Sequence, residues 1–121
     1  MNGNQGAIVA GQTDAVFGPT FSTSPQPMAV YDHLVRLVAA NPAYLAFTRE
    51  SLEQLVGRTP DDRRYSFADG GDRLVELVAG RADSCQTELE IHRADGTSAA
   101  ATVTGHAVRH DGELTHIGLR L

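Results

Sequence analysis

Cysteine is nearly absent from this sequence, and the single residue, Cys85, cannot form a disulfide within the chain. This excludes the disulfide frameworks of small secreted domains, so we expect a reducing, cytoplasmic compartment. Long apolar runs are also missing. The stretch at residues 7–10 is too short for a signal peptide or a membrane span, so we expect no membrane partner.

Clusters of basic residues are missing as well, and the formal net charge of the 121 residues is −5. The densest charged run, "DDRRY", contains both signs. Nucleic-acid-binding domains usually carry a basic patch, so we expect no nucleic-acid partner. With 41% hydrophobic residues, the chain can form one domain around a buried core. We expect that domain at residues 21–121, preceded at 1–20 by a flexible arm or short helix.

Catalytic motifs are not evident in the sequence. There is no Ser-His-Asp order and no phosphate-binding loop. The five histidines fall mostly on predicted strands, where exposed sheet positions explain them better than a metal does. Glu88 and Glu90 share the solvent side of one strand, away from any cleft that would shift their pKa values. We therefore expect neither catalytic residues nor a metal, and predict that the chain is not an enzyme.

Helix signals are clear in the middle of the chain. Asn41 is a good N-cap and Pro42 suits the first helical position of "NPAYLAF". Ser51 and Gln54 predict a capping box at the start of "SLEQLVG". A third helix is expected in "SFADGGDRLVELVAG", because its apolar residues share one face and Gly80 can end it.

Strand signals flank these helices. "MAVYD" and "HLVRLVAA" precede them, and "CQTELEIHR", "SAAATVTGHAVRH" and "ELTHIGLRL" follow with turns at "ADG" and "DG". This pattern predicts an α+β fold, in which short helices pack on one face of a five-stranded antiparallel sheet.

The strand at residues 98–110 has unusually small inward side chains. A three-residue turn at Ala94-Asp95-Gly96 would place Ile91 beside Ala99 and Leu89 beside Ala101, which matches the apolar faces of the two strands. Two explanations stay open for the alanines. Either Tyr44 and Phe47 pack closely there, or the alanines leave room for a small molecule.

The order of these segments resembles the PAS domain, a sensor fold of bacterial signalling proteins. "VAANPAYLAFTRESLEQLVGR" is similar to the family's most recognisable segment, in which Asn-Pro-Ala opens a helix and Ser-x-x-(Glu/Gln)-Leu-x-Gly follows. "FADGGDRLVELVAG" resembles the family's long helix, "TELEIHRADGTS" its Glu-rich strand and Asp-Gly hairpin, and "IGLRL" its last strand. The resemblance covers about residues 21–121.

The resemblance implies a sensory module that binds a small ligand or forms a homodimer, and that regulates an attached kinase, cyclase, phosphatase or transcription factor. The cofactor stays unknown. Haem is not expected, because the familiar haem-binding members use a histidine on the long helix and this chain has none there. Photoactive flavin is not expected either, because the reactive cysteine of those members lies among the short helices, whereas Cys85 begins a strand.

The ligand-binding residues are expected on the helices and on inward strand positions. They are Tyr44, Phe47, Phe67, Leu77, Leu89, Ile91, Ala99, Ala101, Val103 and Arg120.

The last strand admits two registers. With a two-residue turn at Asp111-Gly112, Arg120 shares the face of Val103, where it would pair with an anionic ligand. The apolar residues of the strand then form an outward interface for the N-terminal arm or a second subunit; they are Ile117, Leu119 and Leu121. A longer turn reverses every side chain. We favour the inward Arg120, and the reversed strand stays open.

Two alternatives to ligand sensing remain. One is a ligand-free dimerisation scaffold whose interior is filled by its own side chains. The other, less favoured, is a small cone-fold enzyme of the isomerase type. Such enzymes bury an acid–base pair, and the inward positions of the strands carry no Asp or Glu.

Overall fold

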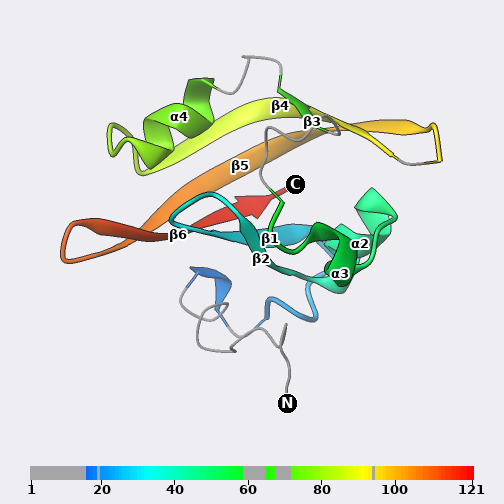
Figure 1. The fold of residues 1–121 in the computed structure, drawn as a ribbon, viewed down its shortest axis with the longest axis horizontal. Helices are drawn as coiled ribbons and strands as arrows, with labels where there is room; N and C mark the ends of the chain where they lie inside the picture. Colours follow the sequence, from blue (N-terminus) through cyan, green and yellow to red (C-terminus); the bar gives the residue numbers. More distant parts are fainter. Residues whose placement is uncertain (1–15, 19, 59–64, 68–71, 94) are drawn as a thin grey trace.

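The structure is a computed structural model of the chain, and it describes residues 16–18, 20–58, 65–67, 72–93 and 95–121. Figure 1 shows the helices and strands of these residues. In chain order they are β1 (Met28–Asp32), β2 (Leu37–Ala40), α2 (Pro42–Thr48), α3 (Leu52–Leu55), β3 (Tyr65–Phe67), α4 (Asp72–Val78), β4 (Ser84–His92), β5 (Ser98–His110) and β6 (Glu113–Arg120). No described helix is long and apolar enough to cross a membrane.

The strands form one antiparallel sheet in the order β2-β1-β6-β5-β4-β3. The first and last strands, β1 and β6, therefore pair side by side in the middle of the sheet (Figure 1). The predicted α+β class, with an antiparallel sheet and short helices, is confirmed. The predicted number of strands was wrong, because the described residues contain six strands where five were expected.

The additional strand is β3. Its residues Tyr65–Phe67 pair with Leu89–Ile91 of β4. Ser66 and Phe67 had been assigned to the start of a helix, but α4 begins only at Asp72. Three residues are too few to show a strand's alternating pattern. Their extended conformation therefore depends on the open edge of β4, which local sequence does not reveal.

The predicted caps of the short helices are confirmed. Asn41 has an extended backbone and accepts a hydrogen bond from the Tyr44 N–H, and Pro42 opens α2. Ser51 and Gln54 form the reciprocal bonds of a capping box at α3. Both helices are very short, so their stability comes mainly from these caps and from tertiary packing.

The predicted register of β4 and β5 is confirmed. Ile91 lies opposite Ala99, and Leu89 lies opposite Ala101. The hairpin is closed by a hydrogen bond of 2.8 Å from the Arg93 N–H to the Thr97 carbonyl. Ala94, which was expected in the turn, lies outside the described residues.

The register of β6 differs from the one we favoured. The turn has two residues, as expected, because His110 pairs with Glu113. Farther along, Val108 pairs with His116, so β6 holds one extra residue at Thr115. This β-bulge shifts the register by one, and such a shift exchanges the two faces of everything beyond it.

The predicted facing of the last strand was therefore wrong. Arg120 pairs with Thr104 on the solvent-side row of β5, so it does not face the core. Ile117 and Leu119, expected to face outward, are 0% and 4% exposed in the main core. Leu121 also packs against that core. The predicted turn length was right, but the bulge after the turn reversed which side chains of β6 face the core.

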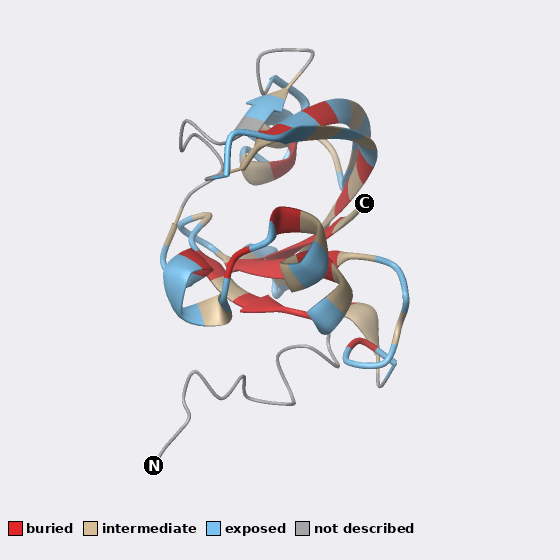
Figure 2. Ribbon diagram, turned by 90° about the vertical axis from the view of Figure 1, so that its right-hand side faces the viewer, coloured by how far each residue is buried: buried red, intermediate tan, exposed pale blue. Residues whose placement is uncertain are grey.

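The sheet has two differently covered faces, which we call inner and outer. The inner face packs against α2, α3 and α4, and its cluster is the larger of the two. Buried residues lie on the strands and on the helices (Figure 2). Its buried members are Ala29, Tyr31, Leu37, Ala40, Tyr44, Leu55, Leu77, Leu89, Ile91, Val103, Ile117 and Leu119. The outer face is covered around β1 by the described residues that precede this strand, 16–18 and 20–27, which we call the N-terminal segment. The buried cluster there consists of Val16, Phe21, Met28, Val30 and Ala39.

The N-terminal segment lies very close to the sheet. The Val16 carbonyl accepts a hydrogen bond of 3.0 Å from Nε2 of His106. The centre of the Phe17 ring lies 5.2 Å from the centre of the same imidazole, in an edge-to-face arrangement. A Cβ on Gly118 would lie 2.6 Å from the Val16 side chain, so only glycine permits this approach. Of the predicted arm or short helix, Val16 and Phe17 are helical, and residues 1–15 lie outside the described part.

Candidate ligand-binding face

The inner face brings together most residues that the sequence indicated for ligand binding. Buried in its cluster are Tyr44, Leu77, Leu89, Ile91 and Val103, with Phe47 and Phe67 packed against it. Ala99 and Ala101 share this face, because they pair with Ile91 and Leu89. Arg120 is the exception, since it lies on the outer face. Whether these residues line a binding site stays a proposal.

The inner face of β5 is closely packed at the end beneath α4. A Cβ on Gly105 would lie 3.1 Å from Leu119, 3.2 Å from the Cys85 sulfur and 3.4 Å from Leu77. These separations are at or below ordinary contact distance, so side chains already occupy the space that glycine leaves. The small residue is needed at this end because α4 and β6 approach closely.

The opposite end of β5, next to the β4–β5 hairpin, is less covered. Ala99 and Ala101 remain partly exposed although they face inward, while their partners Ile91 and Leu89 are buried. Phe47 of α2 and Phe67 of β3 are partly exposed as well. The inner face is therefore closely packed under α4, whereas its alanines and aromatic side chains near the hairpin are partly exposed.

Asn41 anchors the N-terminal end of α2. Its side-chain oxygen accepts bonds from the Met28 and Tyr44 N–H groups at 3.0 and 2.9 Å. Its amide nitrogen donates to the Phe21 and Gln26 carbonyls, both at 2.9 Å. The side chain is 1% exposed, so these four bonds satisfy a buried amide completely. One residue thus joins α2, β1 and the N-terminal segment.

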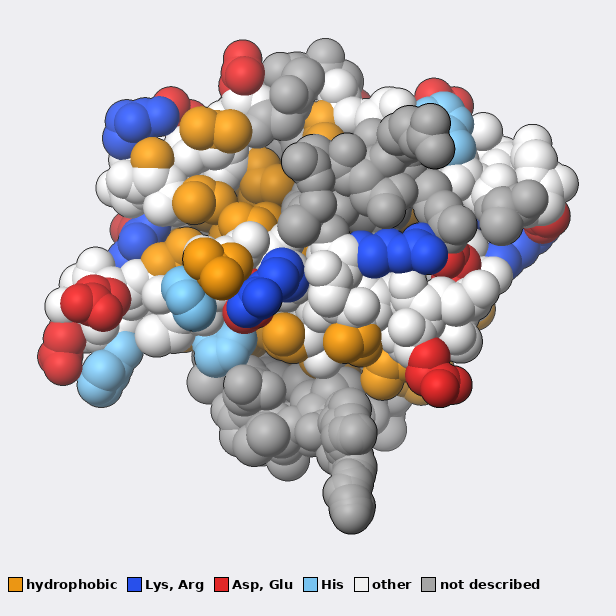
Figure 3. Space-filling view, in the orientation of Figure 1, with side chains coloured by type: hydrophobic (Ala, Val, Ile, Leu, Met, Phe, Trp, Pro, Cys, Tyr) orange, Lys and Arg blue, Asp and Glu red, His pale blue; other side chains and the backbone are white. Residues whose placement is uncertain are grey.

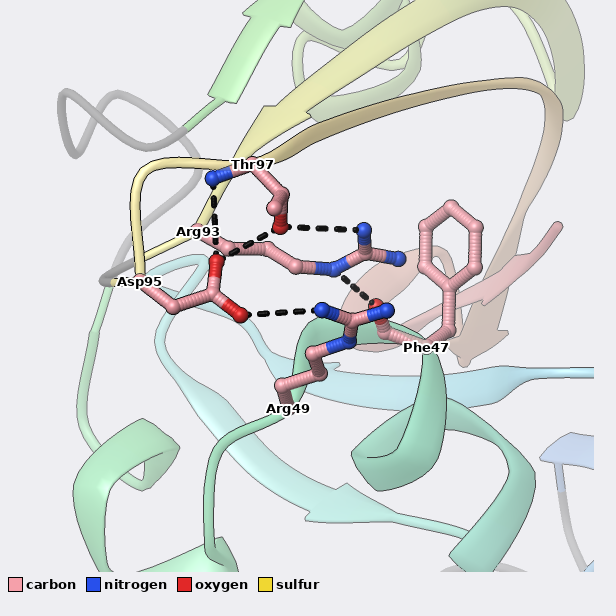
Figure 4. Close-up of polar contacts among 5 residues, drawn as sticks. All are labelled: Phe47, Arg49, Arg93, Asp95 and Thr97. Carbon is pink, nitrogen blue, oxygen red and sulfur yellow. Dashed lines mark hydrogen bonds and ion pairs between the residues drawn. The ribbon is translucent and has the colours of Figure 1, made fainter.

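The β4–β5 hairpin holds the C-terminal end of α2 (Figure 4). Arg93 donates from Nε to the Phe47 carbonyl at 2.8 Å, and its guanidinium carbon lies 5.4 Å from the centre of the Phe47 ring. Arg49, the C-cap of α2, pairs with Asp95 at 2.9 Å. Asp95 also accepts bonds from the hydroxyl and backbone N–H of Thr97. Asp95 was expected in the turn, but no contact of Arg49, Arg93 or Asp95 between the hairpin and α2 was predicted.

The hydrogen bonds to Asp95 favour its charged form. The Thr97 hydroxyl, the Thr97 N–H and then the Arg49 guanidinium hold the pKa of Asp95 well below its usual range. A lowered pKa stabilises the fold above the unfolded-state pKa, and this contribution is lost as the pH falls through the folded-state value. The carboxylate is therefore ionised at all pH values near neutral, as pairing with Arg49 requires.

The histidines do not gather around a common centre in the described residues. His92 bridges two strands, with Nε2 2.9 Å from the Ser66 hydroxyl and Nδ1 3.3 Å from the Ser98 hydroxyl. His106 lies against the N-terminal segment. Within the described ranges, no three His, Cys, Asp or Glu residues are placed to hold a metal ion.

Apolar side chains are also exposed on and below α4 (Figure 3). Val75 is 57% exposed on that helix, while Leu77 on its opposite side is buried. Arg109 of β5 holds the end of the helix by donating to the Leu77 carbonyl at 2.8 Å. A basic side chain at this position complements the helix dipole, so its role is structural.

Comparisons with known proteins agree with this architecture. The model of a family described as "PAS fold" matches residues 21–120. A PAS domain of an HTR-like protein from Haloarcula marismortui has 16% identity and a TM-score of 0.66, with 84% of this chain and 90% of that chain covered. The PAS domain of nitrogen regulation protein NR(II) from Vibrio parahaemolyticus has 14% identity and a TM-score of 0.66, covering 84% and 93%.

The light-state dimer of the fungal blue-light photoreceptor Vivid is similar too, with 15% identity, a TM-score of 0.69, and 100% of this chain and 98% of that chain covered. No curated protein sequence matches. At these identities the structural likenesses show the fold alone, whereas the family match extends over most of the chain. The chain therefore belongs to the PAS fold family.

Proposed function

We propose that this chain is a sensory module that binds a small, uncharged, mainly apolar molecule on its inner sheet face and regulates an attached output domain. The observation that carries the proposal is the difference between the two ends of β5. Side chains fill the space at Gly105, whereas Ala99 and Ala101 face inward and stay partly exposed. Ligand sites are typically lined by apolar and aromatic side chains, and such side chains surround these alanines.

The chemistry of the ligand follows from what surrounds these alanines. The inner-face residues at this end are Phe47, Phe67, Leu89, Ile91, Ala99 and Ala101. Arg120 had suggested an anionic ligand, but it lies on the outer face. The cations at this end, Arg93 and Arg49, are already engaged by the Phe47 carbonyl and by Asp95, so an uncharged ligand suits the face better than an anion.

A dimerisation scaffold is the second candidate. The dimeric photoreceptor among the structural relatives makes pairing plausible for the fold. However, the apolar stripe expected to mediate pairing is buried, because Ile117 and Leu119 belong to the core. An enzymatic role is less favoured, because the inner positions of β4 opposite Ala99 and Ala101 carry leucine and isoleucine, not an acid–base pair.

Native mass spectrometry of the freshly purified chain, compared with its denatured mass, tests for a bound ligand. Nile red, an uncharged apolar dye, then serves as a probe for the inner face. Ala101→Leu should raise the dissociation constant of Nile red by about tenfold or more, equivalent to roughly 1.4 kcal/mol. Ala100→Leu is the matched control, because Ala100 is the neighbouring residue on the exposed face, and it should leave the affinity unchanged.

Thermal unfolding of the same variants gives an independent result. In an open space the added leucine of Ala101→Leu is tolerated, whereas in a close-packed core it costs about 1–3 kcal/mol of unfolding free energy. A variant that is destabilised by that amount, or dye binding that is equal in both variants, would refute the proposed site. A dimer without bound mass or dye binding would favour the scaffold.

A further inference from the structure

The two ends of α2 are held in different ways. At its N-terminal end, Asn41 is buried and makes four hydrogen bonds. At the other end, the link to the β4–β5 hairpin consists of the Arg93 contacts with Phe47 and the Arg49–Asp95 ion pair. The ion-paired side chains are 55% and 46% exposed. This link is therefore accessible to solvent, and exposed ion pairs are weak enough to open and close readily.

The hairpin is the more exposed side of this link, and the end of α2 is the more firmly packed side. Thr48 and Glu50, which flank Arg49, are 1% and 8% exposed, and Glu50 pairs with Arg58 at 3.1 Å. These contacts fix the end of α2 on the domain. By contrast, Asp95 and Thr97 are exposed, and apart from the pair with Arg49 their hydrogen bonds to described residues lie within the hairpin itself (Figure 4).

The link stands at the partly exposed end of the inner face. Ala99 follows Thr97 by two residues on β5, and Phe47, which Arg93 contacts, packs against the inner cluster. When Arg49 and Arg93 hold the hairpin against α2, charged side chains cross this end of the face and restrict access to the partly exposed alanines.

We propose that the β4–β5 hairpin is a lid on the inner face, latched to the end of α2 by Arg49–Asp95 and by Arg93 on the Phe47 carbonyl. Opening of the latch admits and releases a molecule at Ala99 and Ala101. The latch itself is independent of what the face binds, but its gating role rests on the proposed ligand-binding function.

Arg49 offers a way to weaken the latch without replacing any residue of the hairpin. It is a left-handed residue, with φ of 61°, so Arg49→Asn removes the ion pair while keeping a residue that tolerates this backbone. Arg81→Asn is the matched control. It removes an ion pair of the same 2.9 Å length and similar exposure, Arg81–Glu76, which joins neighbouring residues at the end of α4.

Hydrogen exchange of the full chain by NMR measures the latch. Arg49→Asn should speed exchange of the Arg93 and Gly96 amides, which close the hairpin, by about two- to fivefold, while α4 amides keep their rates. Arg81→Asn should leave the hairpin amides unchanged. Equal hairpin exchange in both variants would refute the latch, as would a uniform rise over the whole chain, which signifies global destabilisation.

Stopped-flow binding of Nile red measures the gating. Arg49→Asn should raise both the association rate and the dissociation rate of the dye by about two- to fivefold, the factor that loss of an exposed ion pair implies. The affinity should stay nearly unchanged, because both rates rise together. Faster hairpin exchange with unchanged dye rates would refute the gating role and leave the latch established. Failure of the unaltered chain to bind Nile red would refute the ligand-binding function and gating together, while the exchange data would still decide the latch.

Discussion

Asn41→Ala is expected to lower the unfolding free energy by about 2–4 kcal/mol, among the largest effects of any single polar substitution in this chain. The variant loses the N-cap of α2, and it also leaves the buried N–H of Met28 and the carbonyls of Phe21 and Gln26 without their partner. Removing one side of a buried hydrogen bond costs more than the bond contributed, because the remaining group stays desolvated.

Urea unfolding of the purified variant measures this loss. Ser51→Ala is the matched control, because Ser51 is also an N-cap and makes the same type of bond to a backbone N–H, but it is exposed. It should cost about 0.5–1 kcal/mol. Equal losses for the two variants would mean that Asn41 acts as a helix cap alone and does not join the three segments.

Leu119→Glu is expected to lower the unfolding free energy by more than about 4 kcal/mol and to prevent folding of a domain of ordinary stability. Leu119 is 4% exposed and lies opposite Gly105 in the closely packed part of the core. A carboxylate there would be buried without a partner. The volume-conserving control Leu119→Met should cost less than about 1.5 kcal/mol.

The adjacent substitution, Arg120→Glu, tests the register itself. Arg120 lies on the outer face opposite Thr104 and is partly exposed, so its replacement should change stability by about 0.5 kcal/mol or less. Circular dichroism melting curves of the two variants give the comparison. If Arg120→Glu unfolded the chain and Leu119→Glu were tolerated, the strand would lack the bulge and the opposite face would be buried.

The spacing of the apolar residues in β6 contains evidence of the bulge, which is missed if a strictly alternating strand is assumed. Leu114, Ile117 and Leu119 all pack on the inner cluster, and the first two are separated by three positions. In a regular strand, an odd separation places two residues on opposite faces. Three apolar residues with this spacing therefore indicate an extra residue between Leu114 and Ile117, where the structure has Thr115.

Other parts of the site had no local signal. Arg49, Arg93 and Asp95 are ordinary charged residues in the sequence, and the pair Arg49–Asp95 is separated by 46 positions. Nothing near Gly118 in the sequence indicates that a glycine is required there; the requirement comes from the close contact with the N-terminal segment. The roles of these four residues depend on which distant segments come into contact, and local propensity does not reveal those contacts.

Features governed by neighbouring residues could be predicted before the fold was known. They are the N-caps at Asn41 and Ser51, the turns, and the β4–β5 register through its apolar match. The α+β class followed from them. Three features emerge only when the chain is folded: β3 pairs with the edge of β4, a bulge turns Leu119 inward, and the hairpin reaches α2. The physical reason is range: caps and turns are local energies, whereas strand facing and latches come from contacts between distant segments.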